Sequence, residues 1–386
     1  MRVYIHVQHL LGTGHVVRAA ALGRALVEAG CQVRLASGNT IPPTVDLTGL
    51  DVYLLPKARS ADAHFSAILD ENDDPISEDW KAARKDNLRS DVLAFQPDIL
   101  LTETFPFGRR AFRFELLPLL EELNAQANPP LIAASIRDIL VRKDDPKKER
   151  GMAELFLKHY DLLLVHSDPA FTRLEDSFAA TDLISDKLAY TGYIHGASSI
   201  PARNEDGSDE ILISCGGGAV GLNLLKTALV ARQHSKAACD KTWRLLVGKD
   251  ILDADLAALR TDAHEGLIVE RARPDFPALL HRVALSVSQT GYNTALDILA
   301  AGCRALFIPF ATGDETEQTQ RAEALCARGF SHLLPETSLT PVTLASAIDK
   351  ALAAPVKKAH LDTNGSEKSA EILIRARENQ RIQAKG

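Results

Sequence analysis

Short apolar segments alternate with longer amphipathic segments along the first half of the chain. The apolar segments predict buried strands, and the amphipathic ones, with apolar residues three and four positions apart, predict helices. Strands are expected at residues 3–7, 32–36, 51–55, 98–102, 131–135, 162–165 and 188–191. Helices are expected at residues 16–29, 79–95, 108–127 and 149–159. Because strands and helices alternate, we predict a parallel sheet covered by helices on both faces.

The same alternation begins again after residue 209. Strands are expected at residues 210–214, 243–247, 267–270, 283–287 and 305–308, each followed by a helix. We therefore predict an α/β protein of two doubly wound Rossmann-like domains that face each other across a cleft, the expected ligand site. The expected boundaries are 1–195 for the N-terminal domain, 196–209 for a polar linker, 210–365 for the C-terminal domain, and 366–386 for a charged helix that can pack back on the N-terminal domain.

Composition narrows the class of protein. A chain of 386 residues suits two domains of ordinary size, and 46% hydrophobic with 25% charged residues is typical of a soluble globular protein. The net charge of −7 argues against nucleic-acid binding. Five scattered cysteines favour a reducing cytoplasm over a disulfide framework. No apolar run approaches the roughly 18 residues of a membrane span, and residues 1–6 lack the apolar core of a signal peptide.

Polar residues follow the strands of the second half, where open α/β sheets bind ligands. They supply backbone amides for phosphate, a carboxylate for a diol and amide side chains for hydroxyls, a set that suits a sugar nucleotide. Asp297 also fits a polar stripe on an exposed helix, and residues 314–317 also fit a helix capping box. The residues of this region that are candidates for binding the sugar nucleotide, as the donor of a sugar, are Ser288, Gln289, Thr290, Gly291, Asn293, Asp297, Glu317 and Gln318.

A glycine-rich turn follows the first strand of the second half. Gly216, Gly217 and Gly218 precede a helix there, and such a turn can cradle a phosphate. It is not a Walker loop, because no Gly-Lys-Ser or Gly-Lys-Thr follows. Close packing of the strand against the helix remains the alternative explanation.

The first turn of the chain, Gly12-Thr13-Gly14-His15, joins the first strand to the first helix. It is not a dinucleotide fingerprint, because Val17 stands where that motif has its third glycine. His15 begins the helix, where the helix dipole disfavours the imidazolium and keeps the ring a neutral base near pH 7. A capping or merely exposed histidine remains open.

Two carboxylates at strand ends, Glu103 and Asp138, are further candidates for the same cleft. His6 and His9 are three residues apart on or just after a strand, so they face opposite sides and are poor partners for a metal. We expect no metal site.

Taken together, the glycine turns and the 283–330 segment resemble the GT-B fold glycosyltransferases of the family 28, MurG-like type. The chain is also similar to a bacterial group of glycosyltransferases that open with Val-Gln-His-Leu-Leu-Gly-x-Gly-His, as residues 7–15 do here. The resemblance implies an acceptor-side N-terminal domain and a nucleotide-sugar-binding C-terminal domain. By resemblance, Gly12, Gly14 and His15 match the acceptor-side loop, Gly216–Gly218 the nucleotide loop, Asp297 an acid on the ribose, and Glu317 with Gln318 the pair that holds the donor sugar.

The chain departs from the family pattern at three points. Asp297 stands where the family has glutamate, Glu317 replaces the first of two glutamines, and the His15 loop is one glycine shorter. These departures affect the choice of sugar more than the class of donor.

The expected function is transfer of a hexose from a UDP-sugar to an acceptor hydroxyl. The transfer is expected to invert the configuration at the anomeric carbon and to need neither a metal nor a cofactor. His15 would deprotonate the acceptor, and glycine-loop amides with helix dipoles would stabilise the departing diphosphate. The acceptor stays open between a lipid, a polysaccharide and a small molecule, as does peripheral contact with a membrane. The alternatives are a UDP-sugar hydrolase or epimerase of the same fold and a non-catalytic nucleotide-sugar-binding regulator.

Overall fold

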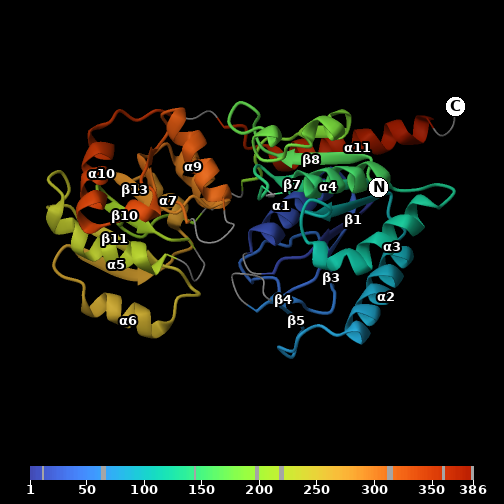
Figure 1. Cartoon of the computed structure of the whole chain (residues 1–386), viewed down its shortest axis with the longest axis horizontal. Coiled ribbons are helices and arrows are strands. Elements are labelled where there is room, and N and C mark those ends of the chain that lie inside the picture. The colour runs from blue at the N-terminus through green and yellow to red at the C-terminus, as the bar shows by residue number, and fades with distance from the viewer. Residues whose placement is uncertain are drawn as a thin grey trace. The chain divides into compact units, whose positions relative to one another are not determined.

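The computed structural model describes residues 1–10, 13–61, 67–142, 145–195, 200–216, 221–310, 316–358 and 361–383. The chain divides into two compact units (Figure 1). The first combines Met1–Gly196 with Asp362–Gly386, and the second is Ala197–Leu361. Across the described residues, the structure has no helix whose length and hydrophobicity would suit a membrane crossing.

The first unit is built on a parallel sheet of seven strands in the order β3-β2-β1-β6-β7-β8-β9. The strands are β1 (Arg2–Val7), β2 (Gln32–Ser37), β3 (Asp51–Leu54), β6 (Ile99–Glu103), β7 (Leu131–Arg137), β8 (Leu162–His166) and β9 (Leu188–Tyr190). Its helices are α1 (Gly14–Glu28), α2 (Glu78–Phe95), α3 (Arg113–Asn124), α4 (Pro146–His159) and α11 (Gly365–Gln383). The strand order reverses between β1 and β6, so the loops after these two strands meet at the switch point of the sheet, where this fold class binds ligands.

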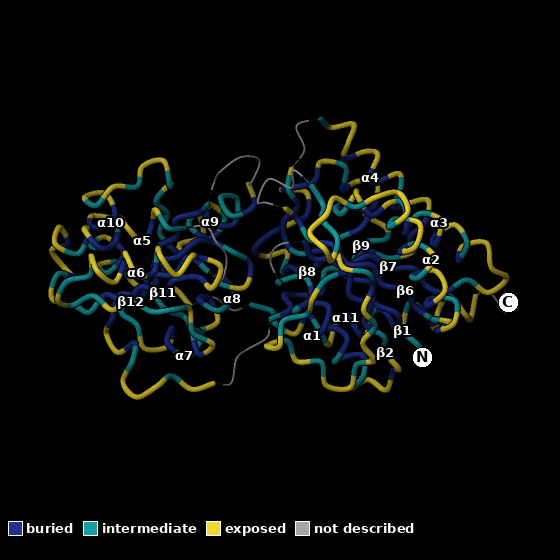
Figure 2. The backbone as a smooth tube through the Cα atoms, turned by 90° about the horizontal axis from the view of Figure 1, so that it is seen from below, coloured by how far each residue is buried: buried dark blue, intermediate teal, exposed yellow. Residues whose placement is uncertain are grey.

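Side chains of the first sheet alternate between two apolar cores, as the twofold period of a strand requires. On β1, Val3 and Ile5 join the core beneath α1 and α11, whereas Tyr4 joins the core beneath α2, α3 and α4. Figure 2 shows the central strands buried between these layers. Helix α11 packs against α1 and β7, so the end of the chain completes one face of the first unit.

The second unit repeats this plan with a parallel sheet of six strands in the order β12-β11-β10-β13-β14-β15. The strands are β10 (Ile211–Ser214), β11 (Trp243–Val247), β12 (Leu267–Arg271), β13 (Leu285–Ser288), β14 (Ala305–Phe307) and β15 (His332–Leu333). The helices are α5 (Leu222–Ala231), α6 (Asp253–Thr261), α7 (Phe276–Leu280), α8 (Tyr292–Ala301), α9 (Glu317–Ala327) and α10 (Pro341–Ala353). Here the switch point lies between β10 and β13.

Two doubly wound parallel sheets confirm the predicted fold class, and the remaining differences are local. The pattern did not predict the β4 (Arg59–Ser60) and β5 (Ile68–Leu69) hairpin or the edge strand β15, because two residues carry no readable period. The helix expected over 108–127 is a 3-10 turn, Arg110–Phe112, followed by α3, which ends at Asn124.

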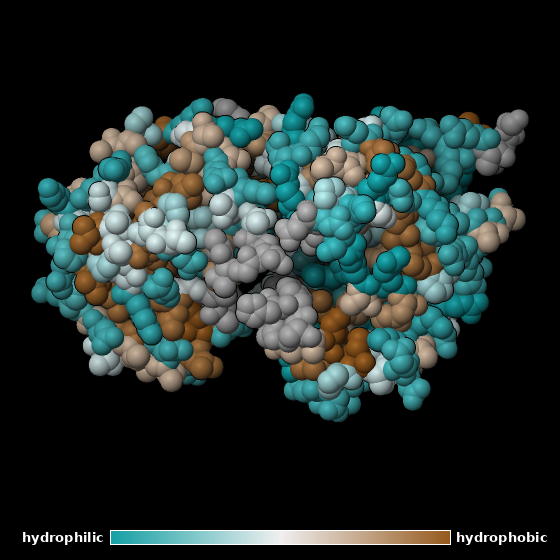
Figure 3. Space-filling model, in the orientation of Figure 1, coloured by the Kyte–Doolittle hydropathy of each residue, from teal (hydrophilic) through white to brown (hydrophobic). Residues whose placement is uncertain are grey.

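The described part of the expected linker, residues 200–209, is fixed to the second unit. Asp206 forms ion pairs with Arg244 at 3.2 Å and with Arg273 at 2.5 Å. The face seen in Figure 3 carries many hydrophilic side chains, with apolar areas on both units. Single exposed apolar side chains such as Leu252 and Val342 are normal for a folded chain.

Candidate active site

The ring of His15 meets a buried carboxylate at the switch point of the first sheet. His15 is the second residue of α1, and its Nδ1 lies 2.9 Å from each carboxylate oxygen of Glu103. Glu103 ends β6, the neighbour of β1, so the topology brings two residues 88 positions apart to one sheet edge. The His15 side chain is only 16% exposed, and the N-cap residue of α1 is Thr13, so His15 is neither fully exposed nor the cap of the helix.

Glu103 is held as a carboxylate by its neighbours. Arg18 Nη2 donates to one oxygen at 2.8 Å, and the Thr104 hydroxyl donates to the other at 2.7 Å. Burial alone would raise the pKa of Glu103, but His15, Arg18 and Thr104 more than offset it and hold the pKa well below its ordinary range. The negative charge beside His15 is therefore permanent at neutral pH.

The environment keeps the His15 ring neutral. Burial lowers its pKa to about 4, the positive charges of Arg109 and Arg18 act in the same direction, and Glu103 opposes them. From the sequence we expected the helix dipole to keep the His15 ring neutral, whereas in the structure burial is the main cause. A neutral imidazole next to a carboxylate is the arrangement of a general base.

The segment after β6 holds an unusual backbone. Thr104 has φ 67° and Arg109 has φ 57°, both in the left-handed region that β-branched and long side chains seldom adopt. Each such residue costs on the order of 1–3 kcal/mol. The Thr104 N–H donates to Ser135 O at 2.8 Å, and the Gly108 N–H donates to Thr104 O at 3.0 Å. The strain lies beside the candidate base, where it fixes the directions of Thr104 and Arg109.

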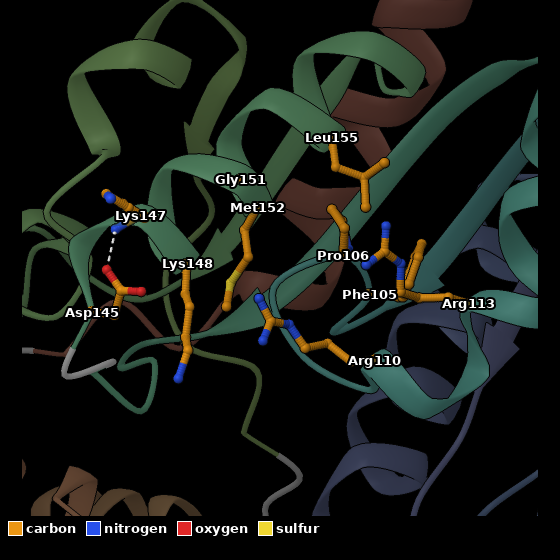
Figure 4. Close-up of a pocket in the computed structure, with 10 residues that line it drawn as sticks. All are labelled: Phe105, Pro106, Arg110, Arg113, Asp145, Lys147, Lys148, Gly151, Met152 and Leu155. Carbon is orange, nitrogen blue, oxygen red and sulfur yellow. Dashed lines mark hydrogen bonds between the residues drawn. The ribbon is translucent and has the colours of Figure 1, made fainter.

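A pocket of about 350 Å³ opens next to this segment (Figure 4). Its apolar wall comes from the loop after β6 and from α4, and includes Phe105, Pro106, Met152 and Leu155. Four cations and one acid line it as well, namely Arg110, Arg113, Lys147, Lys148 and Asp145. The acid is occupied as the N-cap of α4, where it accepts the Lys147 N–H at 2.9 Å. The pocket is therefore strongly cationic in a chain of net charge −7.

The other candidates of the first unit lie as follows. Asp138, just after β7, is 1% exposed and its Oδ1 accepts the Ile139 N–H at 3.0 Å, whereas Glu103 contacts His15. Thr13 and Gly14 stand at the start of α1, with Thr13 as its N-cap residue. Gly12 lies outside the described residues.

In the second unit, the glycine turn after β10 is described only at its edges. Gly216 has φ 72° and Gly217 and Gly218 lie outside the described residues. Gly221 caps α5 with φ 104°, and a Cβ there would lie 2.2 Å from the Cβ of Cys215. Glycine at 221 is thus required by close packing, while Gly216 has open space around it and can approach a ligand.

The polar segment after β13 is more structural than the sequence suggested. Ser288, Gln289 and Thr290 are all less than 10% exposed. The side-chain oxygen of Gln318 accepts the N–H of Thr290 at 3.0 Å and of Phe310 at 3.2 Å. The Thr290 amide and the Gln318 oxygen therefore tie two loops together.

Helix α8 presents its polar positions as expected from their spacing. Gly291 is the N-cap of α8, Asn293 is exposed, and Asp297 one turn later is half-buried. Glu317 begins α9 and is 6% exposed. The capping box expected from Asp314 falls partly outside the described residues.

No metal centre is evident at these sites. Within the described ranges, no three His, Cys, Asp or Glu side chains are grouped so as to hold a metal ion. The one Asp-x-Asp sequence of the chain, Asp253 and Asp255, opens α6, where Asp253 pairs with Arg271.

A family model described as the glycosyltransferase family 28 C-terminal domain matches residues 212–375. Among curated proteins, the UDP-N-acetylglucosamine--N-acetylmuramyl-(pentapeptide) pyrophosphoryl-undecaprenol N-acetylglucosamine transferase of an Exiguobacterium strain is 26% identical over 266 residues, which cover 69% of this chain and 68% of that protein. Among solved structures, Acinetobacter baumannii MurG has a TM-score of 0.57 at 14% identity, covering 100% of this chain and 98% of that one. A Listeria monocytogenes structure named as a UDP-N-acetylglucosamine 2-epimerase has a TM-score of 0.61 at 12% identity, covering 99% and 97%.

The family match begins in β10 and runs through the second unit into α11. The second unit thus carries a glycosyltransferase family 28 C-terminal domain. The likeness to the two solved structures shows the fold alone, because both are less than 25% identical to this chain.

The sequence predicted part of the polar cluster around His15 and missed the rest. Arg18, Thr104 and Arg109 were not predicted. Arg18 carried a signal, because it lies three residues after His15 on the same helix face. Arg109 carried none, since its position depends on the irregular backbone after β6.

Proposed function

We propose that this glycosyltransferase moves a hexose from a UDP-sugar to an acceptor hydroxyl, with His15 as general base. The observation that carries the proposal is the neutral His15 ring held against the buried carboxylate of Glu103. A donor of the UDP-sugar class is supported by the name of the curated relative and by the family 28 domain of the second unit.

The proposed step is a single displacement. The acceptor oxygen bonds to the anomeric carbon while the bond from that carbon to the diphosphate breaks, so the configuration inverts. The hydroxyl proton goes to Nε2 of His15, and Glu103 stabilises the imidazolium through Nδ1–H. The glycine turn at 216–218 and the N-terminus of α8 would take the negative charge of the leaving UDP.

Donor recognition is assigned to α8 and its surroundings. Asp297, half-buried one turn after exposed Asn293, would accept hydrogen bonds from the ribose hydroxyls. The side-chain NH₂ of Gln318 and the carboxylate of Glu317 would contact the sugar. Because Gln318 also ties two loops, its loss should disturb the site as well as remove a contact.

For the acceptor we infer an anionic, lipid-linked alcohol. The curated relative acts, by its name, on a pyrophosphoryl-undecaprenol carrier. The cationic pocket with an apolar wall lies on the same loop as Glu103 and Thr104, which suits a phosphate-bearing group with an apolar chain. Such an acceptor would bring the enzyme to the cytoplasmic face of a membrane as a peripheral protein.

We propose that the reaction needs no metal, with amides and helix dipoles in the role of a cation. Should a metal be required, Asp253 and Asp255 are the first residues to replace.

Product analysis tests the proposal. The purified chain is incubated with UDP-, GDP- and dTDP-hexoses and with phosphorylated polyprenol acceptors, and the products are separated. A glycoside plus UDP supports transfer. Free sugar plus UDP would instead indicate a hydrolase, an epimer of the donor would indicate an epimerase, and binding without turnover would indicate a regulatory protein. His15→Ala should lower turnover by roughly 10²–10⁴-fold and leave UDP affinity unchanged. Normal turnover in that variant would remove His15 as the base.

A further inference from the structure

Arg109 forms a hydrogen bond with the ring nitrogen of His15 that would receive the proton. Its Nη2 lies 2.9 Å from His15 Nε2. A guanidinium has only donors, so Nε2 must be the acceptor and carry the lone pair. The single hydrogen of the neutral ring is then on Nδ1, which lies 2.9 Å from both Glu103 oxygens. Arg18 Nη2 is further from Nδ1, at 3.3 Å, and donates to Glu103 at 2.8 Å. The tautomer of His15 is thus fixed from both sides, by Glu103 and by Arg109.

Arg109 is built into this position by a buried network. Its Nε donates to the backbone oxygen of Gln8 at 2.7 Å. The Gln8 side chain, 1% exposed, donates to Gly38 O at 3.2 Å and Ala58 O at 3.0 Å, and it accepts from Arg84 Nη2 at 2.6 Å. A Cβ at Gly38 would lie 1.8 Å from the Gln8 oxygen, so only glycine fits there. The guanidinium is therefore placed by the core and is not a passing surface contact.

The charged groups around the ring make Arg109 incompatible with a protonated His15. Among the residues that the structure describes, the ring contacts the acid Glu103 on β6 and the cations Arg18 on α1 and Arg109. Further out, Arg137 at the end of β7 acts on Arg109, His9 after β1 is influenced by both Arg109 and Glu103, and His166 on β8 by Arg18 and Glu103. A proton on Nε2 would place two donors and two positive charges face to face, so the base can work only when Arg109 has left Nε2.

We propose that Arg109 is a positioning residue that caps His15 while no acceptor is bound and is displaced from Nε2 by the acceptor hydroxyl. This inference rests on the proposed function. The cap has a consequence for specificity, because water is the competing acceptor for an activated donor. With the cap in place, Nε2 cannot take a proton from water. Uncapped, the water oxygen would bond to the anomeric carbon, the bond to UDP would break, and the proton would pass to Nε2.

Arg109→Met removes the cap, and Arg150→Met is the matched control. Arg150 lies on α4, is exposed and pairs with Glu154, away from His15 and from the pocket lining. The first measurement is an NMR titration of the histidine rings in the acceptor-free protein, with His15 assigned from its missing signal in His15→Gln. In Arg109→Met the proton affinity of His15 should rise at least about tenfold, since a neighbouring positive charge and a donor are gone. It should not change in Arg150→Met.

The second measurement is release of free sugar from UDP-glucose and UDP-N-acetylglucosamine without acceptor. We expect Arg109→Met to hydrolyse the donor at least several times faster than the wild type and Arg150→Met to match the wild type. Arg109→Lys keeps the charge but lacks the guanidinium fork, which reaches Gln8 O through Nε and His15 Nε2 through Nη2. Its His15 titration and hydrolysis rate should therefore fall between those of the wild type and Arg109→Met.

Four results separate the possible failures. An unchanged His15 titration in folded Arg109→Met and Arg109→Lys overturns the cap. If the His15 titration shifts in Arg109→Met but the rate of donor hydrolysis does not change, the role of Arg109 in preventing hydrolysis is overturned. The titration needs no turnover, so it tests Arg109 independently of the base. If His15→Gln is inactive and the His15 titration is unshifted in Arg109→Met, the proposed base stands and only the role of Arg109 is overturned. Full activity of His15→Gln would remove the base itself.

Discussion

The charge of Glu103 can be removed with almost no change of shape by replacing the residue with glutamine. The glutamine oxygen can still accept from Arg18 or Thr104, as the carboxylate does now at 2.8 and 2.7 Å. What it loses is the negative charge that faces Nδ1 of His15 at 2.9 Å. The substitution therefore tests whether that charge stabilises the imidazolium that forms when the acceptor loses its proton.

The expected loss follows from the geometry. Two unit charges about 4 Å apart interact by roughly 4 kcal/mol at an effective dielectric constant of 20, which is an upper limit here. A hydrogen bond to a charged group contributes about 1.5–3 kcal/mol. Because His15 is neutral before the step and charged after it, this amount falls on the transition state. Turnover of Glu103→Gln should then fall roughly 10- to 150-fold at 1.36 kcal/mol per tenfold.

Turnover is followed by UDP release, and UDP affinity by calorimetry. UDP affinity should be unchanged, since Glu103 lies in the first unit and the donor residues in the second. Glu149→Gln is the matched control, because Glu149 is another buried carboxylate of the first unit that accepts a backbone N–H, from Ala179 at 2.7 Å. A folded Glu103→Gln enzyme with turnover within threefold of the wild type would refute the stabilising role of the charge.

Three further outcomes are expected. The acidic limb of kcat/KM should lie near pH 4, the pKa of His15, and not near the ordinary histidine value of about 6.5. For the same reason the unfolded chain binds this proton at a higher pH than the folded chain does. The free energy of unfolding should therefore decrease as the pH falls from about 6.5 to 4. Asp297→Ala should weaken UDP binding by about 1.5–3 kcal/mol in calorimetry, and unchanged affinity would remove Asp297 from the site. EDTA should leave turnover unchanged, whereas activity lost in EDTA and restored by magnesium would contradict a metal-free step.

Much of the fold could be read from the sequence because buried parallel strands are continuous apolar segments. The expected strands at 3–7, 131–135 and 243–247 match β1, β7 and β11 within two residues. The helix expected after the strand at 283–287 is α8, Tyr292–Ala301. Elements without a period were missed, as the hairpin of β4 and β5 shows.

The candidate site divides in the same way. His15 and Asp297 could be named because their places after a strand or on a helix are local properties of the sequence. The pairing of His15 with Glu103, the cap by Arg109 and the use of Gln318 to tie two loops could not be named. Apart from the bond between Gln318 and Phe310, those contacts join residues 28 to 94 positions apart, and nothing local specifies them.

The sequence by itself thus determined two parallel α/β units and the helix starts that carry the polar residues, because hydrophobic periodicity and glycine turns act over a few residues. The tertiary structure alone decided which side chains meet at the switch point of the first sheet. It also decided the protonation of His15, because burial and the surrounding charges of Glu103, Arg18 and Arg109 exist only when the strands are side by side.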